Sequence, residues 1–363
     1  MQKSFKNILI SLGFVIVIFS VFILNIVTKD KNISESERRT LQLFPKITVD
    51  SIKSSEAMDK FEKYSTDQFA LRDTFRTLKS WFNFNVFYQK DNNKLFEKDG
   101  VIYKMDYPLN ETNLNKSLTK INNVYNRYLK NTNTNVYYAI IPDKNYYLEN
   151  DDHLKIDYER VKELASLKLK DFKYINIWND LKLDDYYNTD LHWKQENLNN
   201  IVYTIEDNMN LVSTKNLKYT KNNLGNFYGS YYGQLEANIS PDTLYTLTNE
   251  TIQNSSVYNF ETQKTGSVYT NETSADRYDT FLYGATPLIR IDNPNAKTDK
   301  ELLLFRDSFG SSLAPLLIEN YSSITLIDLR YISSNLLTNY IDFNNQDVLF
   351  IYSTLILNQN VLK

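Results

Sequence analysis

Short apolar runs that alternate with helical patterns predict an α/β fold for this chain. Residues 136–141 form a β-branched and aromatic run, residues 158–169 have helical spacing, and residues 174–177 form a second run. The same order returns later, with strands expected at 302–305, 324–327 and 348–352 and helices expected at 313–321 and 333–340. Strands separated by helices in this way are typical of a parallel sheet with flanking crossover helices.

Helical patterns and a hairpin precede these strands. Between residues 52 and 88, apolar side chains recur at steps of three and four, which predicts one or two amphipathic helices. These side chains are Met58, Phe61, Phe75, Leu78, Trp81 and Phe82. Such a stripe is expected to face a core rather than a ligand. Asp99-Gly100 predicts a two-residue turn in a hairpin at 94–103, and a helix is expected at 114–130.

Residues 215–295 depart from this order because they are rich in Asn, Thr, Ser and Tyr. Their short alternating pieces predict a β-rich insertion between the segments around residues 192 and 308, which hold the two halves of the candidate site. The glycine and aromatic run 227–233 allows two interpretations. Tyr228 can offer a flat surface to a sugar ring while the Gly229 N–H binds an oxyanion, or the run forms a hairpin with buried tyrosines.

The N-terminus carries an uncharged apolar run over residues 8–27. A helix of this length crosses a bilayer core of about 30 Å. A cleaved signal peptide is the alternative, but its apolar part spans only about 7–15 residues and precedes a small-residue cleavage site, which is absent here. We therefore expect a signal anchor within residues 1–30 that contacts membrane lipid through residues 8–27.

The rest of the chain divides into two parts. Residues 31–93 are expected to form a juxtamembrane linker with helices, and residues 94–363 the main domain. Basic residues lie on both sides of the apolar run, so the positive-inside rule leaves the orientation open. They are Lys3 and Lys6 before it, and Lys29, Lys31, Arg38 and Arg39 after it.

Composition narrows the classes of function. The net charge of −3 gives no reason to expect a nucleic-acid partner, because phosphate-binding proteins usually carry a basic excess. Cysteine is absent from the sequence, which excludes disulfides and thiolate zinc sites. His153 lies in an acidic stretch and is expected at the surface, since a metal site there would need further partners. We expect no metal and no cofactor.

Ser308 is the candidate nucleophile because it follows the expected strand 302–305 and precedes a helix. At such a turn the first helical N–H groups are unpaired, and the helix dipole favours negative charge on a nearby oxygen. The alternative is that Asp307 or Ser308 only caps the helix. Arg306, on the same stretch, is a candidate contact for substrate or oxyanion.

His192 is the candidate base for this serine, since the chain has only two histidines. Side chains two apart in an extended segment point the same way, so Asp190 can reach one imidazole nitrogen while the other faces Ser308. By itself, an Asp-x-His pair also fits a surface pair or half of a metal site. Lys144 follows the strand 136–141 and is expected either as a solvated loop charge or as a substrate contact at the same rim.

The segment Asp190-Leu191-His192-Trp193, followed by Asp307-Ser308-Phe309, resembles the DHHW family. This family is related to the alginate O-acetylation proteins and is SGNH-hydrolase-like. Residues 64–73, 98–103 and 327–331 resemble it as well. The second position of the motif is usually His in the family and is Leu191 here, so no role is assigned to that position.

The resemblance implies an SGNH-like fold and O-acetylation of an extracellular polysaccharide. It also implies a membrane-bound O-acyltransferase as acetyl donor and, with the single apolar run, a single-pass protein of the cell membrane with an extracytoplasmic body. Ser308, His192 and Asp190 would then form an acyl-enzyme triad. A carbohydrate acetyl esterase of the same fold, and a non-catalytic glycan-binding or scaffold protein, are the alternatives.

Overall fold

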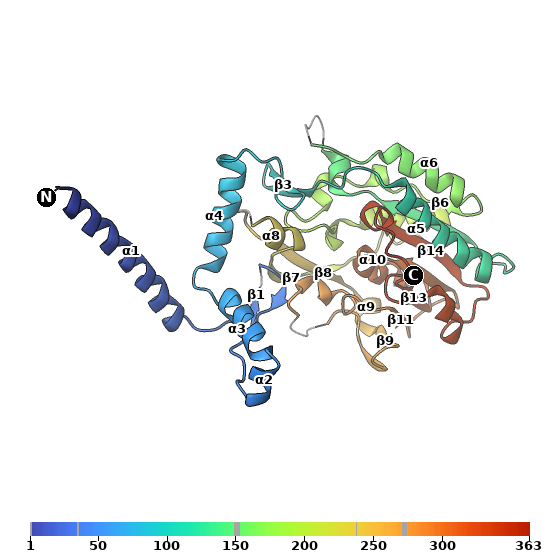
Figure 1. The fold of residues 1–363 in the computed structure, drawn as a ribbon. Coiled ribbons are helices and arrows are strands. Elements are labelled where there is room, and N and C mark those ends of the chain that lie inside the picture. The colour runs from blue at the N-terminus through green and yellow to red at the C-terminus, as the bar shows by residue number, and fades with distance from the viewer. Residues whose placement is uncertain (1, 35, 149–152, 237, 271–273) are drawn as a thin grey trace.

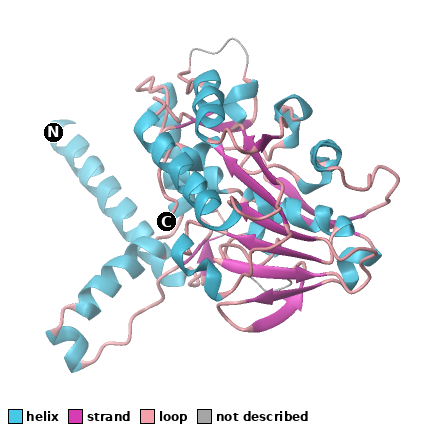
Figure 2. Ribbon diagram, turned by 90° about the vertical axis from the view of Figure 1, so that its right-hand side faces the viewer, coloured by secondary structure: helices cyan, strands magenta, loops and turns pink. Residues whose placement is uncertain are grey.

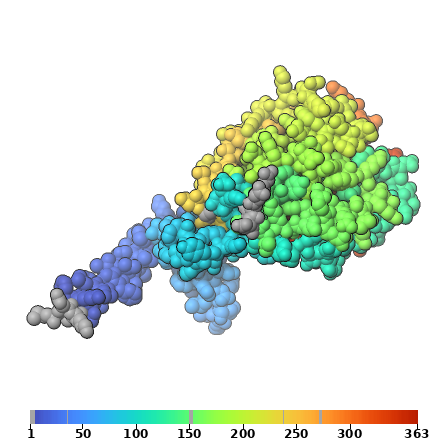
Figure 3. Space-filling model, turned by 90° about the horizontal axis from the view of Figure 1, so that it is seen from above, coloured from blue at the N-terminus to red at the C-terminus, as the bar shows by residue number. Residues whose placement is uncertain are grey.

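The computed structural model describes residues 2–34, 36–148, 153–236, 238–270 and 274–363. An α/β body carries an N-terminal helical arm, by which we mean α1 to α4 and the segments that join them (Figure 1). These helices are α1 (Gln2–Val27), α2 (Val49–Lys53), α3 (Glu56–Asp67) and α4 (Arg72–Asn85). In the space-filling view α1 stands clear of the body (Figure 3).

The body is built on a central sheet, whose strands are magenta in Figure 2. This sheet has eight strands in the order β10-β9-β11-β13-β12-β14-β5-β6. The five parallel strands are β5 (Val136–Ile141), β6 (Lys173–Tyr174), β12 (Glu301–Arg306), β13 (Ser323–Ile327) and β14 (Asp347–Ser353). The predicted α/β class with a mostly parallel sheet is therefore confirmed. β6 is shorter than the expected strand 174–177.

The segment 215–295 contains strands, as its composition predicted, and these strands belong to two different sheets. Only β7 (Thr220–Phe227) and β8 (Asp242–Thr248) form a two-stranded sheet of their own. The later strands extend the central sheet as an antiparallel edge, and they are β9 (Ser256–Asn259), β10 (Lys264–Ser267) and β11 (Leu288–Asp292). Alternating residues predict strands but do not reveal which sheet they join, because pairing is a long-range contact.

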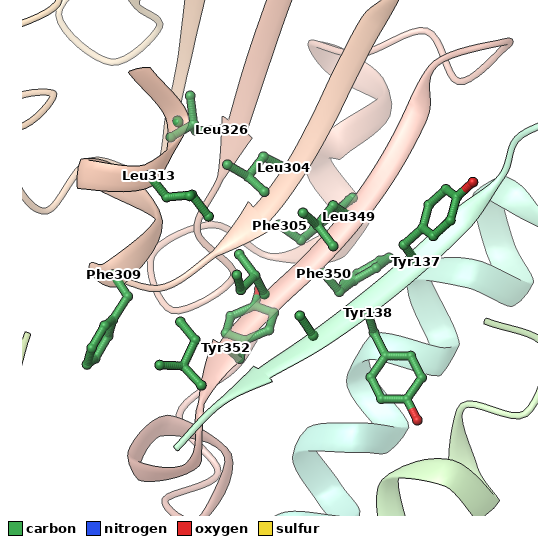
Figure 4. Packing of buried hydrophobic residues seen from close by; sticks show 14 of the residues in the cluster. Tyr137, Tyr138, Leu304, Phe305, Phe309, Leu313, Leu326, Leu349, Phe350 and Tyr352 are labelled. Atoms are coloured by element: carbon green, nitrogen blue, oxygen red, sulfur yellow. The ribbon is translucent and has the colours of Figure 1, made fainter. Parts of the chain in front are cut away.

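The core lies along β5, β12, β13 and β14, which are buried on both faces because apolar side chains occupy consecutive positions. Phe305 and Phe350 on neighbouring strands stack with ring centroids 4.3 Å apart. Tyr352 lies on the same strand as Phe350, and Tyr138 lies on the adjoining strand β5 (Figure 4). The helix α10 (Phe309–Leu317) packs on β12 and β14. Other helices of the body are α5 (Glu111–Val124), α6 (Tyr158–Lys168), α7 (Asn199–Met209), α8 (Ser230–Leu235), α9 (Glu250–Asn254) and α11 (Thr354–Leu357).

The structure confirms two elements that local sequence patterns predicted, a hairpin and a helix. β3 (Leu95–Lys98) and β4 (Val101–Lys104) form the hairpin, and both turn residues have left-handed φ values, 52° at Asp99 and 79° at Gly100. The expected helix 114–130 is α5, which continues as a π-helical turn at Tyr125–Leu129. Glycine suits the left-handed φ of the hairpin turn because it has no Cβ.

The prediction for the aromatic stripe of the arm is wrong. Two helices, α3 and α4, form as expected. Their apolar stripe is exposed instead of facing a core: Met58, Phe61, Phe75, Leu78, Trp81 and Phe82. The helix α1 has no buried residue in its apolar part Phe5–Val27, which is long and apolar enough to cross a membrane. Two short strands, β1 (Ile33–Ser34) and β2 (Arg39–Thr40), pair between α1 and α2.

Candidate active site

The turn after β12 holds Ser308 at the start of α10, close to the end of β14. The buried carboxylate of Asp307 fixes this turn, because it accepts hydrogen bonds from the Phe309 N–H at 3.1 Å and the Ser353 N–H at 2.8 Å. The Ser308 side chain makes no capping bond to the helix. The hydroxyl is therefore free of the cap role that the sequence left open.

The backbone around Ser308 suits a developing negative charge. Among the described residues, none accepts a hydrogen bond from the Ser308 N–H. This N–H lies at the N-terminus of α10, where the helix dipole favours an anion. The Ser308 N–H can therefore donate to an oxyanion that forms at the serine.

The imidazole of His192 lies against Ser308 and is buried, with 4% of the residue exposed. Its Nε2 atom is 2.7 Å from the Ser308 Oγ atom. The ring stacks on Tyr278, with centroids 3.9 Å apart and an angle of 8° between the planes, and Phe309 packs against it at 4.9 Å. Packing by these two rings holds the imidazole in one orientation toward the serine.

Asp190 is fully buried behind His192 and accepts four hydrogen bonds. One carboxylate oxygen binds the His192 Nδ1 and the His192 N–H, the latter at 3.0 Å. The other oxygen accepts from the Ser230 N–H at 2.6 Å and from Arg38 at 2.9 Å. Burial by itself raises the pKa of this carboxyl, but His192, Arg38 and the Ser230 N–H outweigh it and hold the pKa well below its usual range.

The loop that carries Asp190 and His192 is anchored on both sides. The Asp242 carboxylate accepts from the N–H groups of Asn188 and Thr189 at 2.9 and 2.8 Å. On the far side, the Trp193 indole donates to the Phe309 carbonyl at 3.1 Å. Because Phe309 follows Ser308 directly, this last bond joins the histidine loop to the serine turn.

Arg38 is a residue of the site that the sequence analysis missed. Its guanidinium forms ion pairs with Asp190, at 2.9 Å, and with Asp276, and its side chain is 11% exposed. Arg38 lies between β1 and β2 and adopts a left-handed φ of 54°. From the sequence alone, Arg38 was only one of the basic residues that follow the apolar run. A contact between positions 152 apart leaves no local pattern that could have revealed it.

The structure places Lys144 away from solvent, contrary to the expected loop charge or substrate contact. It is 3% exposed, and its Nζ donates to the carbonyls of Tyr187 and Asn188 at 3.0 and 3.3 Å. Burial lowers the pKa of this ammonium to about 7. Lys144 therefore supports the loop that carries Asp190 rather than lining a substrate site.

Gly229 and Arg306, the other candidate contacts for substrate or oxyanion, both contact parts of the protein itself. The Gly229 N–H donates to the Thr189 Oγ at 3.0 Å, so it is not available to an oxyanion. A Cβ at Gly229 would lie 2.3 Å from the Asp190 Cβ, which explains why glycine stands there. Arg306 is fully buried and lies 3.5 Å from Asp328. Both residues are buried and contact other parts of the chain.

Tyr228 and His153 pack on other aromatic residues. Tyr228 packs on Tyr232, with ring centroids 4.8 Å apart, and lines a cavity of about 690 Å³ between the end of α1 and the α3–α4 join. His153 is half-buried and stacks on Phe96 at 3.6 Å. Its acidic neighbours lie outside the described residues. Within the described part of the chain, no cluster of His, Cys, Asp and Glu could hold a metal ion.

Comparisons with known proteins show which family and which folds this chain resembles. The model of the DHHW family, described as DHHW protein, matches residues 172–327. A DHHW family protein from Eubacterium siraeum DSM 15702 has a TM-score of 0.61 at 18% identity, covering 74% of this chain and 93% of that one. Bacillus cereus PatB1 with a sulfonyl adduct has a TM-score of 0.60 at 21% identity, covering 74% of this chain and 96% of that one.

A weaker likeness, with a TM-score of 0.40 at 13% identity, is to the O-acetyltransferase domain of Pseudomonas putida AlgJ, covering 68% of this chain and 84% of that one. No curated protein matches the chain. The resemblance to the DHHW family that the two motifs indicated is confirmed, and the fold is that of its solved members.

Proposed function

From the match to the DHHW family and the geometry of Ser308, we propose that this protein is a membrane-anchored, extracytoplasmic O-acetyltransferase. Its acceptor would be an extracellular or cell-wall polysaccharide. The observation that carries the proposal is the 2.7 Å separation of the His192 Nε2 and the Ser308 Oγ, with Asp190 bonded to the other ring nitrogen. Nucleophile, base and orienting carboxylate in this order are the parts of a serine acyl-transfer site.

The first half of the reaction forms an acyl-enzyme. The Ser308 Oγ attacks the carbonyl carbon of an acetyl donor while its proton passes to the His192 Nε2. The Ser308 N–H stabilises the oxyanion of the tetrahedral intermediate, and Asp190 stabilises the imidazolium. The intermediate then expels the donor's alcohol or thiol group, which takes the proton from His192.

The second half transfers the acetyl group. A sugar hydroxyl loses its proton to His192 and attacks the Ser308 ester, and the proton then returns to the serine as the acetylated sugar leaves. Water in place of the sugar would make the protein an acetyl esterase, because the same side chains serve both acceptors. The family resemblance favours transfer, with a membrane-bound O-acyltransferase as the source of acetyl groups.

The proposal includes the arm. We assign α1 as a single-pass anchor and the body as extracytoplasmic. Residues 94–363 would carry the acyl-transfer chemistry, as the sequence indicated, but Arg38 extends the site into the segment 31–93. The linker is therefore proposed as part of the active unit rather than as a tether.

The Ser308→Ala variant tests the proposal. Full-length protein is incubated with a chromogenic acetyl ester, with and without an oligosaccharide, and acetate, acetylated sugar and intact mass are followed. We expect turnover to fall by about 10³-fold or more in the variant, with the fold retained. A transient gain of about 42 Da, the mass of an acetyl group, should map to Ser308.

A sulfonyl fluoride gives an independent measurement, since PatB1 is known with a sulfonyl adduct. Such a reagent should label Ser308 in the wild type and label neither Ser308→Ala nor the denatured chain. Acetate release without any acetylated sugar would favour the esterase. Equal turnover in wild type and Ser308→Ala would leave the non-catalytic alternative.

A further inference from the structure

We propose that the outward side of α4 lies in the membrane–water interface, so that the body is docked on the bilayer that α1 crosses. This apolar face consists of Phe69, Leu71, Phe75, Leu78, Trp81 and Phe82. The inference rests on the proposed anchoring by α1, but not on the chemistry of Ser308.

The helix α4 is oriented opposite to an ordinary surface helix. Its polar side meets the body: Arg76 donates to the Gly233 carbonyl at 2.8 Å, and Ser80 donates to the Leu235 carbonyl at 2.8 Å. Ser80 is the buried residue of this helix. Residues at steps of four share one side, so the apolar residues between them lie on the other side.

The exposure of the apolar face is large for a surface in water. Leu71 is 58% exposed and Trp81 is 52% exposed, while the other four members are between 37% and 48% exposed. Phe69 and Phe75 lie with ring centroids 5.8 Å apart, so the face continues from the α3–α4 join onto the helix. Monomeric proteins rarely expose a continuous apolar patch of this kind without a partner.

The position of the face relative to α1 indicates that this partner is lipid. The Asn25 side chain, in the last turn of α1, accepts a hydrogen bond from the Ala70 N–H at 2.9 Å. Gln68 accepts from the Lys31 N–H at 2.9 Å. The α3–α4 join is thus bonded to the point where α1 ends, and Figure 1 shows α4 on the side of the body from which α1 projects.

Length and residue type agree with an interfacial depth. The apolar part Phe5–Val27 has 23 residues and is therefore roughly 35 Å long, enough to cross a core of about 30 Å and end at its surface. Tryptophan and other aromatic residues are enriched at that depth, and amphipathic helices insert an apolar side there. A partner membrane protein is the competing occupant.

Docking would also place the membrane next to the candidate site. On the inner side of α4, Arg76 pairs with Glu37 at 2.8 Å, and Arg72 pairs with the same carboxylate. Glu37 precedes Arg38, which binds Asp190. A helix held in the interface would therefore fix the segment that completes the site.

The three tryptophans of the chain allow a direct test. Trp178 and Trp193 are 1% and 0% exposed, so Trp81 is the tryptophan that can meet lipid or water. The full chain is reconstituted alone into lipid nanodiscs made with lipids brominated near the headgroup. The emission of Trp81 is obtained by subtracting the spectrum of Trp81→Phe from that of the wild type.

We expect brominated lipid to quench the Trp81 emission at least about twofold, and aqueous acrylamide to quench it weakly, as for an interfacial aromatic residue. Leu78→Glu should reverse both results, because a charge on this face is costly to place among acyl chains. Trp81 that is open to acrylamide and untouched by brominated lipid would overturn the docking and leave the face to a protein partner.

A second variant separates docking from anchoring. Phe14→Trp in the Trp81→Phe background places a probe in the middle of α1, where lipid brominated deep in the acyl chain should quench it. Quenching at position 14 without quenching at Trp81 refutes the docking alone. The absence of quenching at both positions refutes the anchor and the docking together, while acyl-transfer assays still report on Ser308.

Discussion

The helices α10 and α4 differ in where their apolar residues lie. Those of α10 are buried in the body, whereas most of those of α4 are exposed at its surface. Every residue of α10 from Phe309 to Leu317 is buried, and Ser308, the candidate nucleophile, directly precedes this helix. In α4 the buried residue is a serine, and Phe75, Trp81 and Phe82 are exposed, whereas Phe84 packs on the body. The comparison teaches that an apolar pattern predicts a helix reliably, whereas the medium that the helix faces is decided by its neighbours.

The two regions also differ in how their polar groups are satisfied. Asp190 has four hydrogen-bond donors at its carboxylate and no exposed surface. The polar side of α4 bonds to backbone carbonyls of α8 and leaves its apolar side without a partner among the described residues. Arg38 and Glu37 join the regions, because one binds Asp190 and the other binds α4.

The largest expected effect comes from Asp190→Asn, which changes the carboxylate that accepts four hydrogen bonds behind His192. Asparagine is close in size but cannot hold the tautomer in which Nε2 accepts the Ser308 proton. We expect kcat to fall roughly 10⁴-fold at unchanged fold. Steady-state kinetics and circular dichroism measure the two properties. Asp299→Asn, at an exposed position, is the control and should keep wild-type turnover; a similar loss in that variant would point to a trivial charge effect.

The second prediction compares the same substitution in the two helices. Leu313→Ala, in the fully buried α10, should lower the free energy of unfolding by about 2–5 kcal/mol because it leaves a cavity. Leu78→Ala, on the apolar face of α4, should change it by less than about 0.5 kcal/mol in detergent. Urea unfolding of both variants measures the contrast. Equal losses would mean that Leu78 packs against protein.

Arg38→Ala tests the segment that connects the regions. It removes a charged hydrogen-bond partner from a buried carboxylate, an interaction of about 1.5–3 kcal/mol, so we expect kcat to fall by about 10- to 100-fold. Because Arg38 acts through Asp190 as a positioning residue, KM should stay nearly constant. Arg38→Lys should recover part of kcat, since it keeps the charge. Full activity in Arg38→Ala would remove the linker from the active unit.

The smallest expected effect is the pH dependence that Lys144 gives to stability. Burial lowers the pKa of its ammonium to about 7, whereas an unfolded lysine titrates near 10.4. Between these values the unfolded chain binds more protons, so stability rises with pH. From about pH 7 to pH 9 the free energy of unfolding should rise by up to about 2 kcal/mol. Lys144→Met should abolish the rise; a variant that retains it would assign the effect to another group.

Much of the body could be predicted from the sequence alone. The strands β5, β12, β13 and β14 were predicted because a strand buried on both faces has an uninterrupted apolar run. The hairpin at Asp99-Gly100 was predicted because a two-residue turn needs left-handed φ values. The neighbourhood of Asp190, His192 and Ser308 was expected because the Asp-x-His spacing and the strand-to-helix turn resemble known motifs.

Only the tertiary structure decided the rest. In the folded chain β9 to β11 join the central sheet, and Lys144 is buried. The Gly229 N–H is bonded to Thr189, and Arg38 contacts Asp190. The apolar face of α4 also points away from the body. Local periodicity is set by the geometry of one helix or strand, whereas partners far along the chain are selected by packing and charge, which no short segment of sequence contains.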